Sequence, residues 1–233
     1  RMHRRNTLGD VFGHADTETF NDRLAEAYTR GYARGGGTIE RLDLAALDFD
    51  PVLRSGHRAE QPLEPDLLLA RDAIERADQL VWVFPTYWAS QPAVVRGFVD
   101  RLFLPGWAFR YEGGALPTGL LRGRSARVLS TMDSPWWWYT FVLQRPTHRA
   151  FGTATLSFCG IQPIRYTTLH EVRSLDEAAR SAWCARVEGV AEKDAQRAPS
   201  PGRARGFIGA RSRSTASSAP SDSAQNSIQK LLR

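Results

Sequence analysis

The residues best suited to chemistry in this sequence form a short polar and aromatic loop at 85–91, which contains Thr86 and Trp88. Five consecutive apolar residues, 80–84, precede it and are typical of a strand covered on both faces, as in a parallel sheet. Pro92 follows the loop and suits the first turn of a helix, where its missing N–H costs nothing. Because open α/β sheets bind ligands outside the carboxyl ends of their strands, we expect the loop to line a crevice for a flat aromatic ligand.

A run of adjacent aromatic residues is the second unusual feature: Trp136, Trp137, Trp138 and Tyr139. Neighbouring side chains on a strand or a helix point in different directions, so these side chains cannot all face one core. A contiguous exposed apolar patch would be an aggregation liability unless it had a partner. We therefore expect some of these residues to line a pocket or a subunit interface.

Strand-like and helix-like segments alternate along the chain, which is the signature of a doubly wound parallel sheet. Ser90 is expected to cap the helix after the loop, and Ser174 with Glu177 to form a capping box for the last helix. Glycines 35–37 are expected to end the first helix. The pattern predicts strands at 7–12, 38–44, 80–84, 127–131 and 164–169, and helices at 20–34, 65–77, 92–103, 147–158 and from about 175 onward.

Several familiar site patterns are missing from the sequence. No Gly-x-Gly-x-x-Gly follows a strand and no phosphate-binding loop with its lysine is present, so a classical dinucleotide fold and a P-loop lack support. Cys159 and Cys184 have no partners at metal-ligand or redox spacing, so we expect buried thiols and neither a disulfide nor a metal site. A missing Ser-His-Asp pattern does not exclude an enzyme, because a cofactor can carry redox chemistry.

The loop at 85–91 and the helix after it resemble the NAD(P)H quinone reductase family of flavodoxin-like flavoproteins, in a bacterial branch. The resemblance extends over about residues 13–189 and includes segments similar to the family's flavin-phosphate turn, its second flavin loop and a helix-to-strand junction. Together these motifs are specific, although each alone would be weak. The matching residues are Phe84, Pro85, Trp88, Pro92, Ala93, Gly97, Asp100, Arg101 and Phe103; Gly13, His14, Thr19, Phe20 and Asn21; Thr131, Met132, Asp133, Pro135, Trp137 and Tyr139; and residues 158–161.

The resemblance implies a flavodoxin-like doubly wound five-stranded parallel sheet of strand order 2-1-3-4-5 and a bound FMN or FAD. The flavin phosphate would lie where the first helix begins, because exposed N–H donors and the helix dipole favour an anion there. The ring needs a flat wall and donors near the edge where negative charge develops on reduction. The implied cofactor-binding residues are His14, Thr19, Phe20 and Asn21 in the turn, Pro85, Thr86, Tyr87, Trp88 and Ala89 in the first loop, and Thr131, Met132, Asp133 and Ser134 in the second.

The implied activity is hydride transfer from NAD(P)H through the flavin to quinones or similar electron-poor aromatics. Tyr139 and His148 are the predicted catalytic residues, as donors to the developing anion. In the family the site is completed across a homodimer, so aromatic side chains are expected to reach in from a second subunit. The choices of FMN or FAD, of NADH or NADPH, and of acceptor stay open. The predicted substrate or interface residues are Phe109, Tyr111, Trp136 and Trp137.

Other interpretations of the same residues stay open as well. Thr19 and Asn21 also suit ordinary helix capping, and Trp88 also suits a core or an interface. The family includes ancillary proteins of potassium-efflux systems, so an accessory or regulatory subunit with weak or no turnover is the alternative function. A glycine and Asp10 interrupt the first strand, and this feature and the unusual C-terminal tail favour the alternative slightly. Ala15 stands where the family usually has Pro, a departure that bears on flavin binding.

The net charge of +6 is concentrated near the C-terminus. From residue 193 onward, eight Lys or Arg residues outweigh Asp194 and Asp222, which accounts for the whole excess. We therefore expect a flavin-binding domain at 1–192 and a basic tail at 193–233, rich in Ser, Ala, Pro and Arg and too poor in apolar residues to fold.

The charge-balanced domain offers no basic face for nucleic acid. The tail could bind nucleic acid or an acidic membrane surface, but a solvated extension is the favoured interpretation. No apolar run is long enough for a membrane span, and no hydrophobic signal region follows the basic opening, so we expect a cytoplasmic protein.

Overall fold

The computed structural model describes residues 19–56, 60–113 and 117–197, and the backbone of residues 6–12. His14 and most of the predicted tail lie outside these residues. By compactness the chain divides into a unit of residues 1–203 and a unit of residues 204–233, and only the first contains described residues.

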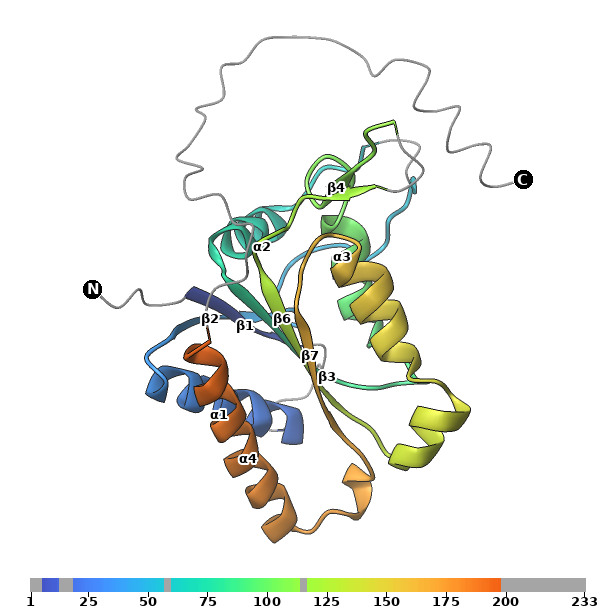
Figure 1. The fold of residues 1–233 in the computed structure, drawn as a ribbon. Helices are drawn as coiled ribbons and strands as arrows, with labels where there is room; N and C mark the ends of the chain where they lie inside the picture. The colour runs from blue at the N-terminus through green and yellow to red at the C-terminus, as the bar shows by residue number, and fades with distance from the viewer. Residues whose placement is uncertain (1–5, 13–18, 57–59, 114–116, 198–233) are drawn as a thin grey trace. The chain divides into compact units, whose positions relative to one another are not determined.

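A five-stranded parallel sheet forms the middle of the domain (Figure 1). Its strands follow the order β2-β1-β3-β6-β7. A separate antiparallel pair, β4 and β5, was not predicted and shifts the numbering of the later strands. The strands are β1 (Asn6–Phe12), β2 (Thr38–Asp43), β3 (Gln79–Pro85), β4 (Phe109–Arg110), β5 (Thr118–Gly119), β6 (Ser125–Thr131) and β7 (Ile164–Leu169).

Helices cover both faces of the sheet (Figure 1). On β3, Trp82 and Phe84 pack with α2, α3 and η2, whereas Val81 and Val83 pack with α1 and α4 on the other face. Each such buried side chain contributes about 1.5–3 kcal/mol, so the all-apolar strand predicted at 80–84 ties two cores together. The helices are α1 (Phe20–Arg34), α2 (Pro65–Arg76), α3 (Ala93–Leu102), the π-helices η1 (Trp138–Val142) and η2 (His148–Ser157), the 3-10 helix η3 (Val172–Ser174) and α4 (Glu177–Ala195).

The ends of α1 follow the expected local chemistry. Thr19 is the N-cap, and its hydroxyl accepts a hydrogen bond from the backbone N–H of Asp22 in a capping box. The helix ends at Arg34 with Gly35 as its C-cap, and Gly36 takes a φ of 86°, which favours glycine. The predicted glycine stop is therefore confirmed.

Two other capping predictions are wrong. Ser90 does not cap α3, because Pro92 occupies the N-cap position and the Ser90 hydroxyl donates to the Gln91 side chain. Ser174 does not cap α4, because it lies in η3; Asp176 takes that role and accepts a hydrogen bond from the Ala179 N–H at 2.7 Å. Both errors arise because the backbone path before the helix decides which candidate reaches the free N–H groups.

The first strand carries the irregularity that its sequence suggested. β1 pairs with β2 and with β3, but its register with β2 shifts between Gly9 and Val11, at Asp10. Such an extra residue bends a strand locally without ending it. β1 therefore still takes its place between β2 and β3.

A buried polar network joins the helices α1 and α4 to the sheet. The fully buried carboxylate of Asp194 accepts hydrogen bonds from Arg127 on β6 and, at 2.9 Å, from the Tyr28 hydroxyl. Gln79 donates to the same Tyr28 oxygen at 2.9 Å. Burial acts to raise the pKa of Asp194, but hydrogen bonds and the charge of Arg127 leave it lowered. Because Asp194 is part of this network, α4 runs past residue 192, where the sequence suggested that the domain ends.

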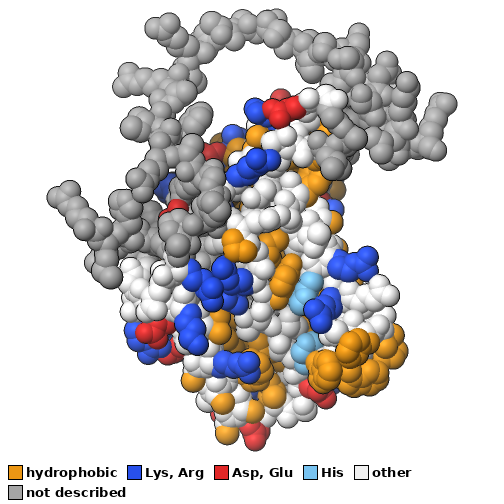
Figure 2. All heavy atoms as spheres, in the orientation of Figure 1, with side chains coloured by type: hydrophobic (Ala, Val, Ile, Leu, Met, Phe, Trp, Pro, Cys, Tyr) orange, Lys and Arg blue, Asp and Glu red, His pale blue; other side chains and the backbone are white. Residues whose placement is uncertain are grey.

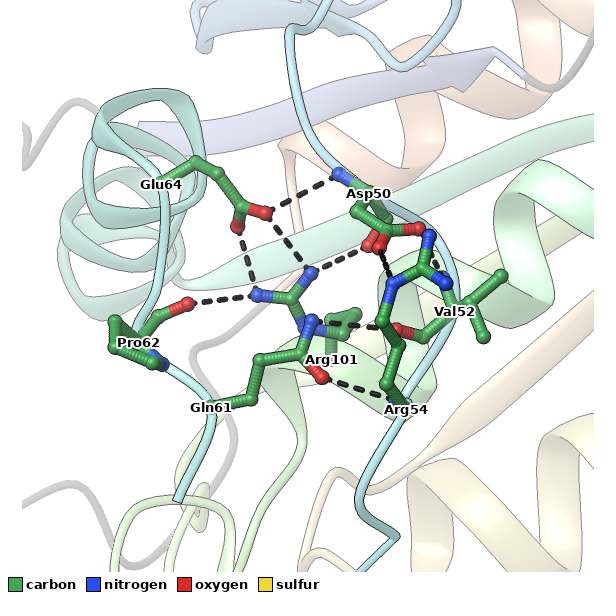
Figure 3. Close-up of polar contacts among 7 residues, drawn as sticks. All are labelled: Asp50, Val52, Arg54, Gln61, Pro62, Glu64 and Arg101. Carbon is green, nitrogen blue, oxygen red and sulfur yellow. Dashed lines mark hydrogen bonds and ion pairs between the residues drawn. The ribbon is translucent and has the colours of Figure 1, made fainter. Parts of the chain in front are cut away.

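A second buried arginine anchors the loop before α2 (Figure 3). Arg101, at the end of α3, donates to both carboxylate oxygens of Glu64, at 3.0 and 2.8 Å. It also donates to the backbone carbonyl oxygens of Asp50 and Pro62. One guanidinium thus holds a loop of irregular backbone against α3.

None of the helices in the described residues combines the length and the apolar character that a membrane span requires.

Candidate functional site at the carboxyl edge of the sheet

Residues from segments far apart in the sequence meet where the parallel strands end. The Thr131 hydroxyl at the end of β6 donates to the Asn21 side-chain oxygen on α1 at 3.0 Å. The Thr86 N–H after β3 donates to the Thr131 carbonyl oxygen at 2.7 Å. The helix start and the two loops implied by the family resemblance are therefore adjacent.

The loop after β3 closes as a tight turn. Tyr87 and Ser90 exchange two backbone hydrogen bonds of 2.9 Å around Trp88 and Ala89. Both central residues have positive φ, 50° and 60°, as in a type I′ turn. Non-glycine residues adopt this conformation at a cost of about 1–2 kcal/mol each, a kind of strain that collects at functional sites. Trp88 is 102% exposed at the tip, so it is not a core residue.

A side-chain contact connects this turn to the predicted catalytic histidine. The Thr147 hydroxyl donates to the Ala89 carbonyl oxygen at 2.8 Å, and His148 is the next residue. The His148 Nε2 lies 3.1 Å from the Thr168 hydroxyl, and its ring stacks on Tyr166 with centroids 4.0 Å apart. The predicted loop and His148 therefore belong to one site.

The His148 imidazole is held in its neutral form. Burial, the charge of Arg145 and the nearby His170 lower the pKa of His148 to about 4. At neutral pH one ring nitrogen therefore carries a proton and the other accepts, and Thr168 occupies Nε2. This leaves Nδ1 for another partner.

Tyr139 is the most enclosed of the predicted site residues. It is 1% exposed, and its ring centroid lies 5.6 Å from His148 and 5.7 Å from His170. Burial raises the pKa of Tyr139, and the Thr147 side chain and the backbone N–H groups of Thr147 and His148 lie near enough to its oxygen to oppose that rise. None of them has the geometry of a hydrogen bond to this oxygen, so neither the Tyr139 hydroxyl nor the buried Thr86 hydroxyl makes a hydrogen bond to a described residue. A buried polar group without a hydrogen bond is costly, so both oxygens are ready to pair with a polar ligand.

Contacts with the end of β7 hold the loop after β6. The Met132 N–H donates to the Leu169 carbonyl oxygen at 2.9 Å, and a His170 ring nitrogen lies 3.0 Å from the Ser134 carbonyl oxygen. The Asp133 carboxylate accepts a hydrogen bond from the Arg173 N–H at 2.9 Å. Asp133 thus holds η3 in place, in addition to any contact with a ligand.

The aromatic run divides between the interior and the surface, as its spacing predicted. Tyr139 is buried, whereas Trp136, Trp137 and Trp138 are 42–56% exposed. Phe141 is also exposed and packs on Trp136. Figure 2 shows the resulting hydrophobic cluster, over η1, beside histidine and basic side chains. An apolar surface therefore adjoins the site.

Phe109 and Tyr111 do not lie at this edge within one chain. Phe109 packs on Phe158, with ring centroids 4.9 Å apart, and on Tyr111. Phe158 follows η2 and precedes β7, so this pair lies toward the amino ends of the strands, as the position of β4 shows (Figure 1). Their contribution to a second subunit's site stays a prediction.

Sequence reasoning missed three residues on and directly after β7, namely Tyr166, Thr168 and His170. Each of them contacts a predicted site residue, as described above. The signal was present, because the predicted fold places the strands at 127–131 and 164–169 side by side. Polar residues at the carboxyl end of the second strand should have been included for the same reason as the loop after β3.

Comparison with known proteins shows the family of this chain. The model of the flavodoxin-like fold family matches residues 10–189, so the chain belongs to that family. Human ribosyldihydronicotinamide dehydrogenase (quinone) is 26% identical over 208 residues, covering 77% of this chain and 90% of that protein.

Solved structures share the architecture. The NAD(P)H:quinone oxidoreductase from Methanothermobacter marburgensis has a TM-score of 0.70 at 22% identity, covering 82% of this chain and 98% of that one. An FMN-dependent NADH-azoreductase from Bacillus anthracis, in complex with FMN, has a TM-score of 0.65 at 17% identity, covering 82% and 100%. At these identities the structural likeness establishes the fold alone.

Proposed function

We propose that this protein is a flavin-dependent oxidoreductase that uses NAD(P)H to reduce quinones or similar electron-poor aromatics. The observation that carries the proposal is the edge where Asn21, Thr86 and Thr131 adjoin Tyr139 and His148, with two buried hydroxyls left without partners. The names of the human relative and of the Methanothermobacter structure point to the same activity.

The donor set fits a flavin. The start of α1 would hold the phosphate with its free N–H groups, and the Trp88 turn would provide a flat wall for the ring. Thr86 and the loop at 131–134 would supply hydroxyl and backbone donors at the polar edge of the ring. A bound flavin supplies the ability to accept and to donate hydride. The Bacillus structure with FMN supports a flavin, and either FMN or FAD satisfies the proposal.

The roles of Tyr139 and His148 follow from their surroundings. The Tyr139 hydroxyl is protonated at neutral pH and has no competing hydrogen bond in the described chain, so it is free to donate to an oxygen that gains negative charge. His148 is neutral and is oriented by Thr168 and by stacking on Tyr166, so it offers a fixed hydrogen-bonding nitrogen without adding a charge. The exposed aromatic side chains beside them would exclude water when an acceptor binds.

We also propose that the working form is a homodimer. Trp136 and Trp137 present an apolar surface next to the site, and Phe109 and Tyr111 lie too far from the site in their own chain to serve it. A second subunit would cover the first pair and bring the second pair to its partner's site. Sedimentation of the purified protein tests this: a monomer at micromolar concentration would contradict it.

The activity is tested with purified protein reconstituted with FMN or FAD. We expect a yellow complex that oxidises NADPH or NADH with menadione as the acceptor, and identification of the released flavin then decides between FMN and FAD. If the protein binds neither flavin and oxidises neither nucleotide, the proposal fails. Stable co-purification of a partner protein without turnover would instead support the accessory-subunit alternative.

A further inference from the structure

An open pocket of about 460 Å³ lies beside the proposed catalytic histidine, between η1 and η2. His148 and Tyr166 line it, together with Gln144, Arg145 and Arg149. No Asp or Glu is among the described residues that line it. Figure 2 shows basic side chains next to histidine on this face. The pocket is therefore cationic and adjoins the reacting groups.

Both arginines are available to a ligand. Among the described residues neither Arg145 nor Arg149 makes an ion pair, although arginines of α1, α2 and α3 are paired with carboxylates. Arg149 donates to the Gln144 side-chain oxygen at 2.9 Å, a neutral partner that an anion can displace. The pocket thus contains two guanidinium groups whose charge no described carboxylate neutralises.

The backbone at the pocket is strained in a way that fixes one of these arginines. Gln144 and Arg145 have φ values of 57° and 54°, in the left-handed region that non-glycine residues seldom adopt. The Arg145 N–H donates to the Tyr139 carbonyl oxygen at 2.9 Å, and the Arg149 N–H donates to the Arg145 carbonyl oxygen at 3.1 Å. These bonds hold Arg145 between the two π-helices and tie its position to Tyr139. Strain that the surroundings maintain in this way is characteristic of binding sites.

We propose that Arg145 and Arg149 bind a phosphate group of the nicotinamide nucleotide donor. Guanidinium groups match phosphate oxygens with paired hydrogen bonds, and the stacked rings of His148 and Tyr166 give the sugar or the base a flat surface beside them. A donor whose nicotinamide reaches the site near Tyr139 carries phosphates on the same molecule, within reach of a neighbouring pocket. This inference rests on the proposed function.

Two phosphate sources share this chemistry. The pyrophosphate is common to NADH and NADPH, whereas the 2′-phosphate belongs to NADPH alone. Ligands that carry different phosphates separate the two sources, and the full-length double variant Arg145→Gln/Arg149→Gln tests whether the arginines bind them. Arg186→Gln, an exposed arginine of α4, is the matched control.

The first measurement is calorimetric binding of adenosine 2′,5′-bisphosphate and of ADP, which needs no turnover. We expect the double variant to lose at least about tenfold in affinity for one or both, and the control to bind like the wild type. Loss for the bisphosphate alone assigns the 2′-phosphate. Loss for ADP alone, or for both ligands, assigns the 5′ side of the adenosine, where the pyrophosphate of both nucleotides is attached. Equal binding by the double variant and the wild type, or no binding by either, overturns the inference.

The second measurement is steady-state turnover of the flavin-loaded protein with NADPH and with NADH. We expect the double variant to raise KM at least about tenfold with little change in kcat, because a remote phosphate contact binds the ground state and the transition state alike. If the wild type turns over and the double variant has the same KM values, this phosphate-site inference is contradicted while the proposed function stands. Arginine-dependent binding of the bisphosphate in a protein that oxidises neither nucleotide would contradict the proposed function but leave the phosphate site standing.

Discussion

The two ends of the sheet use buried polar side chains differently. Near the amino ends, the Asp194 carboxylate pairs with Arg127 and Tyr28. Two nitrogens of the Arg101 guanidinium bind a carboxylate and two carbonyls, and only its buried Nε makes no hydrogen bond to a described residue. At the carboxyl edge, the Tyr139 and Thr86 hydroxyls are buried without hydrogen bonds in the described chain, and adjacent turns hold residues at positive φ. We infer that the first end mainly stabilises the fold and that a ligand completes the second.

The largest expected effect is at Arg127. Arg127→Met leaves the Asp194 carboxylate buried without its main partner, so we expect the free energy of unfolding to fall by about 3 kcal/mol or more. Urea unfolding at neutral pH measures this. Arg186→Met on the surface of α4 is the control, expected within about 0.5 kcal/mol of the wild type. If Arg127→Met lowers the free energy of unfolding by less than about 1 kcal/mol, the Arg127–Asp194 network does not stabilise the fold as proposed.

Arg101 gives the next effect. Arg101→Gln removes the donors to the Asp50 and Pro62 carbonyls, and we expect a loss of about 2 kcal/mol, less than at Arg127 because water can reach Glu64. The matched control is Arg54→Gln, in the same loop, whose exposed ion pair with Asp50 is worth less than about 1 kcal/mol (Figure 3). Equal losses for the two variants in urea unfolding would contradict the contrast.

The same deletion in the two regions gives the sharpest comparison. Tyr28→Phe removes a hydrogen bond to the buried carboxylate, so we expect a loss of about 1.5–3 kcal/mol. Tyr139→Phe removes a hydroxyl that has no such bond, so we expect stability within about 1 kcal/mol of the wild type, or higher.

We expect activity to be more sensitive to Tyr139→Phe than to Tyr28→Phe, the reverse of the order expected for stability. Tyr139→Phe should lower kcat of the flavin-loaded protein about a hundredfold. A stable Tyr139→Phe protein with full activity would remove Tyr139 from the proposed chemistry. A Tyr139→Phe protein that unfolds as readily as Tyr28→Phe would show that both hydroxyls are structural.

The last effect concerns His148 and is confined to acid pH. Its pKa in the folded protein is about 4, below the ordinary 6.5, so the unfolded chain takes up a proton first as the pH falls. The wild type should therefore lose stability between pH 6.5 and pH 4, and His148→Gln should lose less over that window. Histidine NMR gives the titration directly; a His148 midpoint near 6.5 would contradict its burial in the site.

Local patterns predicted much of the fold because its decisive signals are short. The bounds of α1 and of β7 agree with the sequence, since a capping box, a glycine stop and a run bounded by a proline mark them. The pattern missed β4 and β5, which are two residues long, and did not foresee that the segment after Thr147 is a π-helix. Such details depend on tertiary contacts, which no window of sequence contains.

The candidate site was partly predictable for a related reason. The loop after β3 was predictable because it directly follows a buried apolar strand, and Asn21 and the loop after β6 were predictable from their resemblance to family motifs. Tyr166 and Arg145 escaped attention because their importance depends on stacking and on a left-handed backbone, and neither leaves a pattern in the sequence. The predicted role of Phe109 and Tyr111 concerns the site of a second subunit, so it depends on contacts between two chains.

The central claim is that the carboxyl edge is incomplete because a flavin completes it. Titration of FMN and of FAD into the apoprotein, followed by quenching of flavin fluorescence, tests it most directly. We predict saturable binding with a Kd of about 1 μM or tighter, weakened about tenfold by Thr86→Val but unchanged by Thr155→Val on η2. No saturable binding of either flavin, or binding that Thr86→Val leaves unaltered, would contradict it.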